Sequence, residues 1–173
     1  MGDGATTAMG KAARLTLMGF DVDGVLTDGT LYIGAQGESF KAFIILDGHG
    51  MKMLQSAGIV TAIISGRSSE AVVRRAAELA IAHVAQGCAD KVATFEALRA
   101  QLGVQASECS FVGDDLPDLA VMQRCGFAVA VANAAEPVKQ AAHYVTRACG
   151  GRGAVREFCD LVLTAREFRG QTP

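Results

Sequence analysis

Short apolar runs alternate with amphipathic stretches along most of this chain. The runs have the length of buried strands and lie at 15–20, 59–64, 109–112 and 127–131, with weaker strand signals at 83–85 and 143–145. Apolar residues at helical spacing predict helices at 50–57, 68–78, 90–102 and 116–124, a short helix after residue 133 and a closing helix to about residue 168. This alternation predicts an α/β fold: a Rossmann-like, mostly parallel sheet with helices on both faces and right-handed crossovers.

One segment departs from this alternation. Two β-prone runs, 31–33 and 39–44, flank a turn at 34–37 that contains two glycines, which predicts a protruding β-hairpin. About forty residues separate Asp23 from Ser65, and this hairpin and one helix fill them. A separate cap domain therefore has no room between these positions. The hairpin is either a lid for an active site or an ordinary edge hairpin.

Length and composition predict a single domain. The 173 residues, 50% of them hydrophobic, suffice for one sizeable core but not for two. Residues 1–14 are rich in Gly, Ala and Thr and predict a flexible N-terminal tail. We therefore expect one domain over residues 15–168 and a short C-terminal tail over residues 169–173.

Charge and cysteine content exclude several functions. The net charge is -2 and the 16 Lys and Arg residues are scattered, so the basic patch of a nucleic-acid-binding protein is missing. No apolar stretch approaches the roughly eighteen residues of a membrane span. The five cysteines show neither a CxxC pair nor metal-ligand spacing, which fits reduced thiols in a cytoplasmic protein.

Acidic residues follow two of the predicted strands. Asp21 and Asp23 end the first apolar run, and Gly113-Asp114-Asp115 ends the run at 109–112, with Asp118 one helical turn further on. Because the carboxyl ends of parallel strands open into the same crevice, these acids are expected to converge. Converging carboxylates repel one another and persist most easily around a hard cation such as Mg²⁺. The alternative is that Asp and Gly merely mark strand-ending turns.

Two further positions complete a set suited to phosphoryl transfer. Ser65 follows the run at 59–64, and Lys91 begins a predicted helix. An aspartate can attack phosphorus and form an aspartyl-phosphate, while a second acid protonates the leaving alcohol and later deprotonates water. A hydroxyl and an ammonium group can hold the phosphoryl oxygens. The residue types therefore point to Mg²⁺-dependent phosphate chemistry.

In chain order, these positions resemble the motifs of the haloacid dehalogenase-like (HAD-like) phosphatases. The matching segments are Asp21-Val22-Asp23-Gly24, Ser65, Lys91 and Gly113-Asp114-Asp115. The resemblance implies that Asp21 is the nucleophile, that Asp23 is the general acid and base, and that Lys91 keeps Asp21 ionised.

The same resemblance implies a metal site and a phosphate site. Asp21, the backbone carbonyl of Asp23 and Asp114 would hold Mg²⁺. Asp115 and Asp118 would support the metal ligands. The phosphoryl group would be bound by Ser65, Gly66 and Lys91.

Longer segments resemble one capless family of these enzymes, which hydrolyses 3-deoxy-D-manno-octulosonate 8-phosphate. They are 21–29, 47–50, 65–67 and 150–157, and the resemblance covers roughly residues 15–165. It implies a homotetramer in which the hairpin of one subunit covers a neighbour's active site, and a cytoplasmic step toward lipopolysaccharide. Leu46 and His49 depart from that family's pattern, which leaves the substrate contacts of their loop open.

Arg67 bears on the substrate. It lies two residues past Ser65, and its guanidinium suits bidentate recognition of a carboxylate, so a phosphorylated sugar acid is the expected substrate. In the resembled family, an arginine here goes with the eight-carbon ulosonate. Arg67 is alternatively a surface charge at a helix start.

Two other functions stay open. One is a phosphatase for another sugar-acid phosphate, such as a nine-carbon ulosonate. The other is a non-catalytic oligomerisation module related to those of nucleotidyltransferases. Such a module can lose its nucleophile, and this chain retains Asp21, Asp23, Lys91 and Asp114, which favours an enzyme.

Overall fold

A six-stranded parallel sheet forms the centre of the molecule. The computed structural model describes residues 7–170. The strand order is β5-β4-β1-β6-β7-β8 and every neighbouring pair is parallel, so the predicted α/β fold is confirmed. The strands are β1 (Leu17–Phe20), β4 (Val60–Ile64), β5 (His83–Ala85), β6 (Cys109–Gly113), β7 (Phe127–Ala130) and β8 (Tyr144–Val145).

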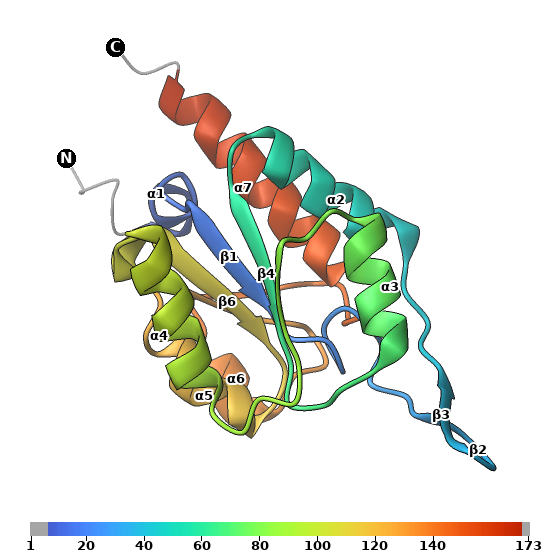
Figure 1. Cartoon of the computed structure of the whole chain (residues 1–173). Helices are drawn as coiled ribbons and strands as arrows, with labels where there is room; N and C mark the ends of the chain where they lie inside the picture. Colours follow the sequence, from blue (N-terminus) through green and yellow to red (C-terminus); the bar gives the residue numbers. More distant parts are fainter. Residues whose placement is uncertain (1–6, 171–173) are drawn as a thin grey trace.

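Helices cover both faces of this sheet (Figure 1). They are α1 (Ala8–Ala12), α2 (Ile45–Ser56), α3 (Glu70–Glu78), α4 (Lys91–Leu102), α5 (Leu116–Met122), α6 (Glu136–Ala141) and α7 (Ala154–Gly170), with a 3-10 turn, η1, at Ala106–Glu108. α2 and α7 pack against each other on one face, and α4 and α5 contact each other on the opposite face. No helix within residues 7–170 is long and apolar enough to cross a membrane.

Strand β1 lies in the middle of the sheet and is buried along its whole length. Helices cover both of its faces, which explains why the strand reads as a continuous apolar run instead of an alternating one. Gly19 leaves room for the Phe111 ring, because a Cβ at this position would lie 2.7 Å from it. Phe111 in turn packs edge-on against Phe95 of α4, with ring centroids 5.9 Å apart. This packing anchors the strand that ends directly before Asp21.

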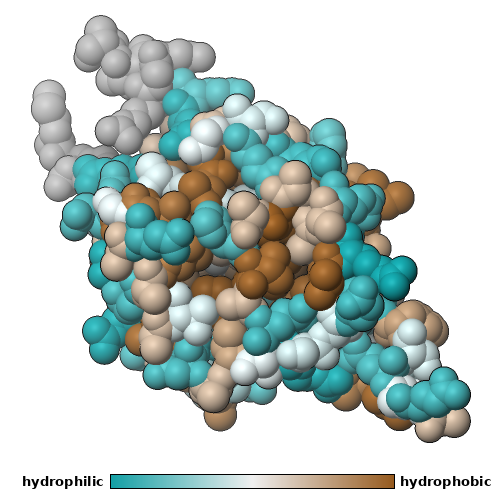
Figure 2. Space-filling model, in the orientation of Figure 1, coloured by the Kyte–Doolittle hydropathy of each residue, from teal (hydrophilic) through white to brown (hydrophobic). Residues whose placement is uncertain are grey.

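The predicted hairpin is formed by β2 (Tyr32–Gly34) and β3 (Gly37–Phe40), and it projects from the body of the molecule (Figure 1; Figure 2). Tyr32 stacks on Phe40, with ring centroids 4.3 Å apart. Ile33 and Phe40 are nevertheless 65% and 56% exposed. Pairing ends at Phe40, although the sequence predicts a strand to residue 44, and the side chain of the next residue, Lys41, contacts Asp23.

Both ends of the chain differ from the prediction. Residues 8–12 form α1 instead of belonging to a flexible tail, because Ala12 is fully buried where α1 contacts α7. Residues 1–6 of the predicted tail lie outside the described residues. Helix α7 continues to Gly170, so the predicted tail at 169–173 is wrong for its first two residues, and 171–173 lie outside the description. Helix α2 also begins earlier than predicted, at Ile45.

Candidate active site

All the predicted site residues line one cavity of about 240 Å³ at the carboxyl ends of β1, β4 and β6. They meet there because β1 pairs with β4 on one side and with β6 on the other, so the loops after the three strands are neighbours. The predicted site residues in the lining are Asp21, Asp23, Ser65, Gly66, Arg67, Lys91, Asp114, Asp115 and Asp118, and Pro117 is the one further residue that lines the cavity.

Three carboxylates converge at the base of this site. Asp21, Asp114 and Asp118 each offer an oxygen atom within 4.8 Å of the others. Lys91 Nζ lies 2.9 Å from Asp21 Oδ1 and 2.7 Å from Asp118 Oδ1. Asp90 caps α4 by accepting from the Ala93 amide, so Lys91 stands at the first residue of the helix. We call these three aspartates and Lys91 the acid cluster.

The acid cluster is short of positive charge. Burial, and then the charge of Asp118, raise the pKa of Asp21 to about 6, against the opposing effect of Lys91. Burial, and then Asp118 and Asp21, raise the pKa of Asp114 to about 7. Burial lowers the pKa of Lys91, but the charges of Asp21 and Asp118 outweigh it and the net shift is upward. A divalent cation would supply the missing charge, and carboxylate oxygens are the ligands that Mg²⁺ prefers, so the residues present fit this ion.

Asp118 is held by protein donors on both of its oxygens. Its Oδ1 accepts from Lys91, and its Oδ2 accepts from the backbone amides of Asp114 and Asp115 at 3.0 and 3.3 Å. With Asp115 it also forms the capping box that begins α5. These bonds leave Asp118 better suited to orient Lys91 and the Asp114 loop than to bind a metal ion.

Two glycines, for which no role is predicted from the sequence, allow the acidic loops to approach each other. Gly24 has a φ of +90°, and a Cβ on it would overlap Oδ2 of Asp114. A Cβ on Gly113 would lie 2.7 Å from Cγ of Asp118. Their signal in the sequence is their position directly beside the aspartates of both motifs.

The segment 150–153 packs closely on the loop after β1. The Gly151 amide donates to the Val25 carbonyl at 2.9 Å, and the Gly150 amide donates to Asn133 Oδ1 at 2.7 Å. A Cβ on Gly150 would overlap the backbone of Gly24. The glycines of this segment therefore serve close backbone contact beside the site, in addition to leading into α7.

Ser65 and Arg67 lie on the loop after β4. Ser65 is buried, and its hydroxyl accepts from the Arg67 amide at 3.4 Å. The Arg67 side chain is 46% exposed, and its Nε lies 3.5 Å from Asp23 Oδ2. The guanidinium therefore reaches the crevice and is not simply a surface charge at the start of α3.

Two charged residues, one in β3 and one directly after it, also reach the site, and neither is among the residues predicted from the sequence. Lys41 Nζ lies 2.5 Å from Asp23 Oδ1, and Glu38 Oε2 accepts from Lys41 at 3.1 Å and from Arg67 at 2.8 Å. The available signal was a lysine within the apolar run at 39–44.

The departures from the family pattern lie outside the cavity. Leu46 is 53% exposed and His49 is also exposed. Their neighbour Asp47 is buried and accepts from the Arg156 amide at 2.8 Å, which joins α2 to the start of α7. Burial raises the pKa of Asp47 to about 6. These residues therefore lie in the first part of α2 and not in a loop, and none of them lines the crevice.

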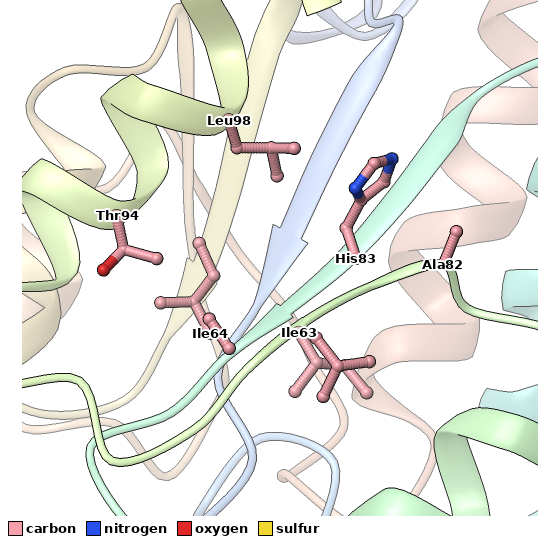
Figure 3. Close-up of a pocket in the computed structure, with 8 residues that line it drawn as sticks. Ile63, Ile64, Ala82, His83, Thr94 and Leu98 are labelled. Carbon is pink, nitrogen blue, oxygen red and sulfur yellow. The ribbon is translucent and has the colours of Figure 1, made fainter. Parts of the chain in front are cut away.

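A second hollow of about 250 Å³ lies between β5 and α4 (Figure 3). It is lined mostly by apolar side chains, among them Ile63, Ile64 and Leu98, with Thr94 and His83 as its polar side chains. Its lining contains no acid, lysine or arginine. It is similar in size to the cavity at the strand ends but lacks groups for phosphate chemistry.

The fold and the acid cluster are those of a HAD-like hydrolase. Residues 80–154 match the family of haloacid dehalogenase-like hydrolases. The 3-deoxy-D-manno-octulosonate 8-phosphate phosphatase of Yersinia pestis is 46% identical over 157 residues, which is 91% of this chain and 84% of that protein. The chain belongs to the family of 3-deoxy-D-manno-octulosonate 8-phosphate phosphatases, as the sequence motifs predict.

Solved structures agree with this assignment. The Yersinia pestis phosphatase structure has a TM-score of 0.90 at 45% identity and covers 94% of this chain and 88% of its own. The Moraxella catarrhalis phosphatase, described in complex with a magnesium ion, a phosphate ion and a KDO molecule, has a TM-score of 0.89 at 43% identity. That comparison covers 92% of this chain and 91% of the other.

Proposed function

We propose that this protein is a Mg²⁺-dependent phosphatase that hydrolyses 3-deoxy-D-manno-octulosonate 8-phosphate to the free sugar acid and inorganic phosphate. The observation that carries the proposal is the acid cluster, in which Asp21 lies beside Asp114 and Lys91 in a cavity at the strand ends. The relatives described above, and the Moraxella catarrhalis complex with its product-like ligands, support the choice of substrate.

The reaction is assigned from the placement of the two neighbouring aspartates. A carboxylate oxygen of Asp21 attacks phosphorus and forms an aspartyl-phosphate, while the bond from phosphorus to the sugar oxygen breaks. Asp23 gives its proton to that oxygen. In the second step, water gives a proton to Asp23 and attacks phosphorus, which releases inorganic phosphate and restores Asp21.

The remaining residues bind and orient. Ser65, Gly66 and Lys91 hold the phosphoryl oxygens, and Arg67 holds the carboxylate of the sugar acid. Asp21, Asp114 and the backbone carbonyl of Asp23 would hold Mg²⁺, with Asp115 and Asp118 orienting the ligands. When bound, the ion would screen the nucleophile from the anionic substrate and stabilise the charge of the transition state.

We also propose that the enzyme is a homotetramer in which a hairpin covers the active site of a neighbouring subunit. The exposed apolar side chains of Ile33 and Phe40 on the hairpin support it, because exposed apolar groups gathered on a projection favour association. Light scattering of the purified protein tests it, and a monomer at micromolar concentration would contradict it.

The cytoplasm is the proposed compartment. All five cysteines are free thiols in the structure, which fits a reducing environment. The substrate, an anionic phosphate ester, does not cross a membrane unaided. Fractionation of source cells, with activity followed in each fraction, tests this assignment.

The assay for the proposed function is release of inorganic phosphate from a panel of sugar-acid phosphates, with and without a chelator. We expect turnover of the eight-carbon ester that disappears on chelation and returns with Mg²⁺. Phosphates of nine-carbon sugar acids should react at least about tenfold more slowly, because Arg67 must meet a carboxylate at a different distance from the phosphate. Equal rates on both classes would contradict the proposed substrate.

A further inference from the structure

Four charged side chains form a closed ring beside the acid cluster. Asp23 contacts Lys41 through Oδ1 at 2.5 Å and Arg67 through Oδ2 at 3.5 Å. Glu38 Oε2 contacts both cations, Lys41 at 3.1 Å and Arg67 at 2.8 Å. Its other oxygen accepts from the Ser69 hydroxyl at 2.8 Å. When both carboxyl groups are ionised, the signs alternate around the ring and its net charge is zero.

The ring keeps the carboxylate of Asp23 away from the acid cluster. The oxygens of Asp21, Asp114 and Asp118 lie within 4.8 Å of one another, and no oxygen of the Asp23 side chain belongs to that group. Each oxygen of Asp23 instead faces a cation of the ring. Although Asp23 is two residues from Asp21, its side chain is paired with Lys41 and Arg67.

Lys41 is the buried member of the ring. Its side chain is only 3% exposed, against 21% for Asp23 and 16% for Glu38. A lysine withdrawn this far from water is costly unless paired, and both of its partners here are carboxylates. One of these partners lines the catalytic cavity. A lysine that served only to attach the hairpin would not need that partner.

We propose that Lys41 is a positioning residue that holds Asp23 in place to protonate the leaving oxygen, with Glu38 fixing both Lys41 and Arg67. This inference rests on the proposed function, in which Asp23 is the general acid and base. Lys41 exchanges no proton in the reaction. Its effect is geometric, because a general acid must lie within hydrogen-bond reach of the leaving oxygen.

Strand β3 and the residue after it thereby take part in the active site of their own chain. Glu38 lies in β3, opposite the exposed Ile33 of β2, and Lys41 follows the last residue of β3. This strand therefore completes the site from within the subunit. This role is independent of which subunit's hairpin covers the cavity.

The test compares leaving groups, because only a poor leaving group needs the proton of Asp23. Lys41→Met is assayed on the eight-carbon ester, on glycerol phosphate and on p-nitrophenyl phosphate. The quantity measured is kcat/KM, which reports formation of the aspartyl-phosphate and not its hydrolysis. We expect a loss of about ten- to a hundredfold on the two alkyl phosphates and less than about threefold on the aryl phosphate.

Two variants serve as controls. Lys52→Met removes an exposed lysine of α2 and should leave all three values unchanged. Lys41→Arg keeps the positive charge and should recover most of the activity on the alkyl phosphates. An equal loss on all three substrates in Lys41→Met, or no loss on any, would overturn the proposal.

A second route remains if Lys41→Met does not fold, which circular dichroism and the thermal midpoint would show. Glu38→Gln leaves Lys41 in place but weakens its support, and it should give the same leaving-group pattern at about three- to tenfold. A Glu38→Gln enzyme without this pattern would contradict the ring.

The proposed substrate is tested separately by the unaltered enzyme. If that enzyme cleaves glycerol phosphate and p-nitrophenyl phosphate but not the eight-carbon ester, the substrate assignment fails. The comparison of the two remaining phosphates would still decide the role of Lys41.

Discussion

Asp21 and Asp23 are separated by one residue, yet their carboxylates face opposite electrostatic surroundings. Asp21 belongs to the acid cluster, where Lys91 pairs with two of the three carboxylates, those of Asp21 and Asp118. Asp23 belongs to the ring, where Lys41 and Arg67 balance two carboxylates. The pKa of Asp21 is raised, whereas hydrogen bonds from Ser69 and Lys41 overcome the effect of burial and lower the pKa of Glu38.

This difference separates two tasks at one strand end. The excess negative charge of the acid cluster favours a divalent cation, and the same cation would neutralise the proposed nucleophile toward an anionic substrate. The balanced ring attracts no further cation, and it holds both oxygens of the Asp23 side chain in fixed contacts. In the proposed function, two acids of the same type therefore take different roles because different segments of the chain approach them.

The largest expected effect comes from the acid cluster. Asp21→Asn removes the nucleophilic oxygen and should lower kcat/KM on every phosphate ester by about 10³-fold or more, while circular dichroism remains unchanged. Asp160→Asn, an exposed substitution on α7, is the matched control and should keep full activity. Near-normal turnover by Asp21→Asn would rule out the covalent mechanism.

Gly24→Ala tests the close approach between the loop of Asp23 and the acid cluster. The added Cβ overlaps Asp114 and strains a backbone with a φ of +90°. We therefore expect the free energy of unfolding to fall by about 1–3 kcal/mol. The Mg²⁺ concentration that gives half-maximal activity should rise about tenfold, because the shifted Asp114 would bind the ion less well. Gly58→Ala shares the positive φ but has open space around it. If both variants lose stability but bind Mg²⁺ alike, the overlap with Asp114 is unimportant.

Arg67→Lys tests the ring. Lysine lacks the planar fork that contacts Glu38 and a substrate carboxylate together, so KM for the eight-carbon ester should rise about tenfold. KM for p-nitrophenyl phosphate, which has no carboxylate, should change less than about twofold. Steady-state kinetics on both substrates measure the contrast, and equal increases would place Arg67 on the phosphoryl group instead.

The smallest expected effect concerns stability without metal. The pKa values of Asp21 and Asp114, about 6 and about 7, exceed their ordinary value of 3.8, so the folded state holds extra protons between about pH 4 and pH 7. The contribution of these groups to stability therefore falls as pH rises through this window. Mg²⁺ should raise the thermal midpoint by about 3 °C more at pH 8 than at pH 5.5.

Thermal unfolding at the two pH values, with chelator or with Mg²⁺, measures this difference. Asp114→Asn should raise the midpoint of the metal-free protein at pH 8, because it removes one of the repelling charges. A Mg²⁺ effect that is larger at pH 5.5 would contradict the assigned repulsion within the acid cluster.

Most of the sheet and the acid cluster were predictable from the sequence. Buried strands such as β1 and β6 appear as short apolar runs, and parallel strands place the loops at their carboxyl ends along one edge of the sheet. Asp21 and Asp114 were therefore expected to meet. The short helix α1 was not expected, because its Ala- and Gly-rich sequence carries little helical periodicity and is stabilised by contact with α7.

The sequence alone shows apolar periodicity, the placement of glycines and the order of the motifs. These features sufficed to predict the fold class, the family and the residues of the acid cluster. The ring of Asp23, Glu38, Lys41 and Arg67 depends instead on where the hairpin leaves the body and on the path of the loop after β4. Three of the ring's four contacts join residues 18 to 44 positions apart, and such contacts have no local pattern, because their distances are set by the packing of the whole chain. For that reason the partners of Asp21 could be anticipated, and those of Asp23 became visible only in three dimensions.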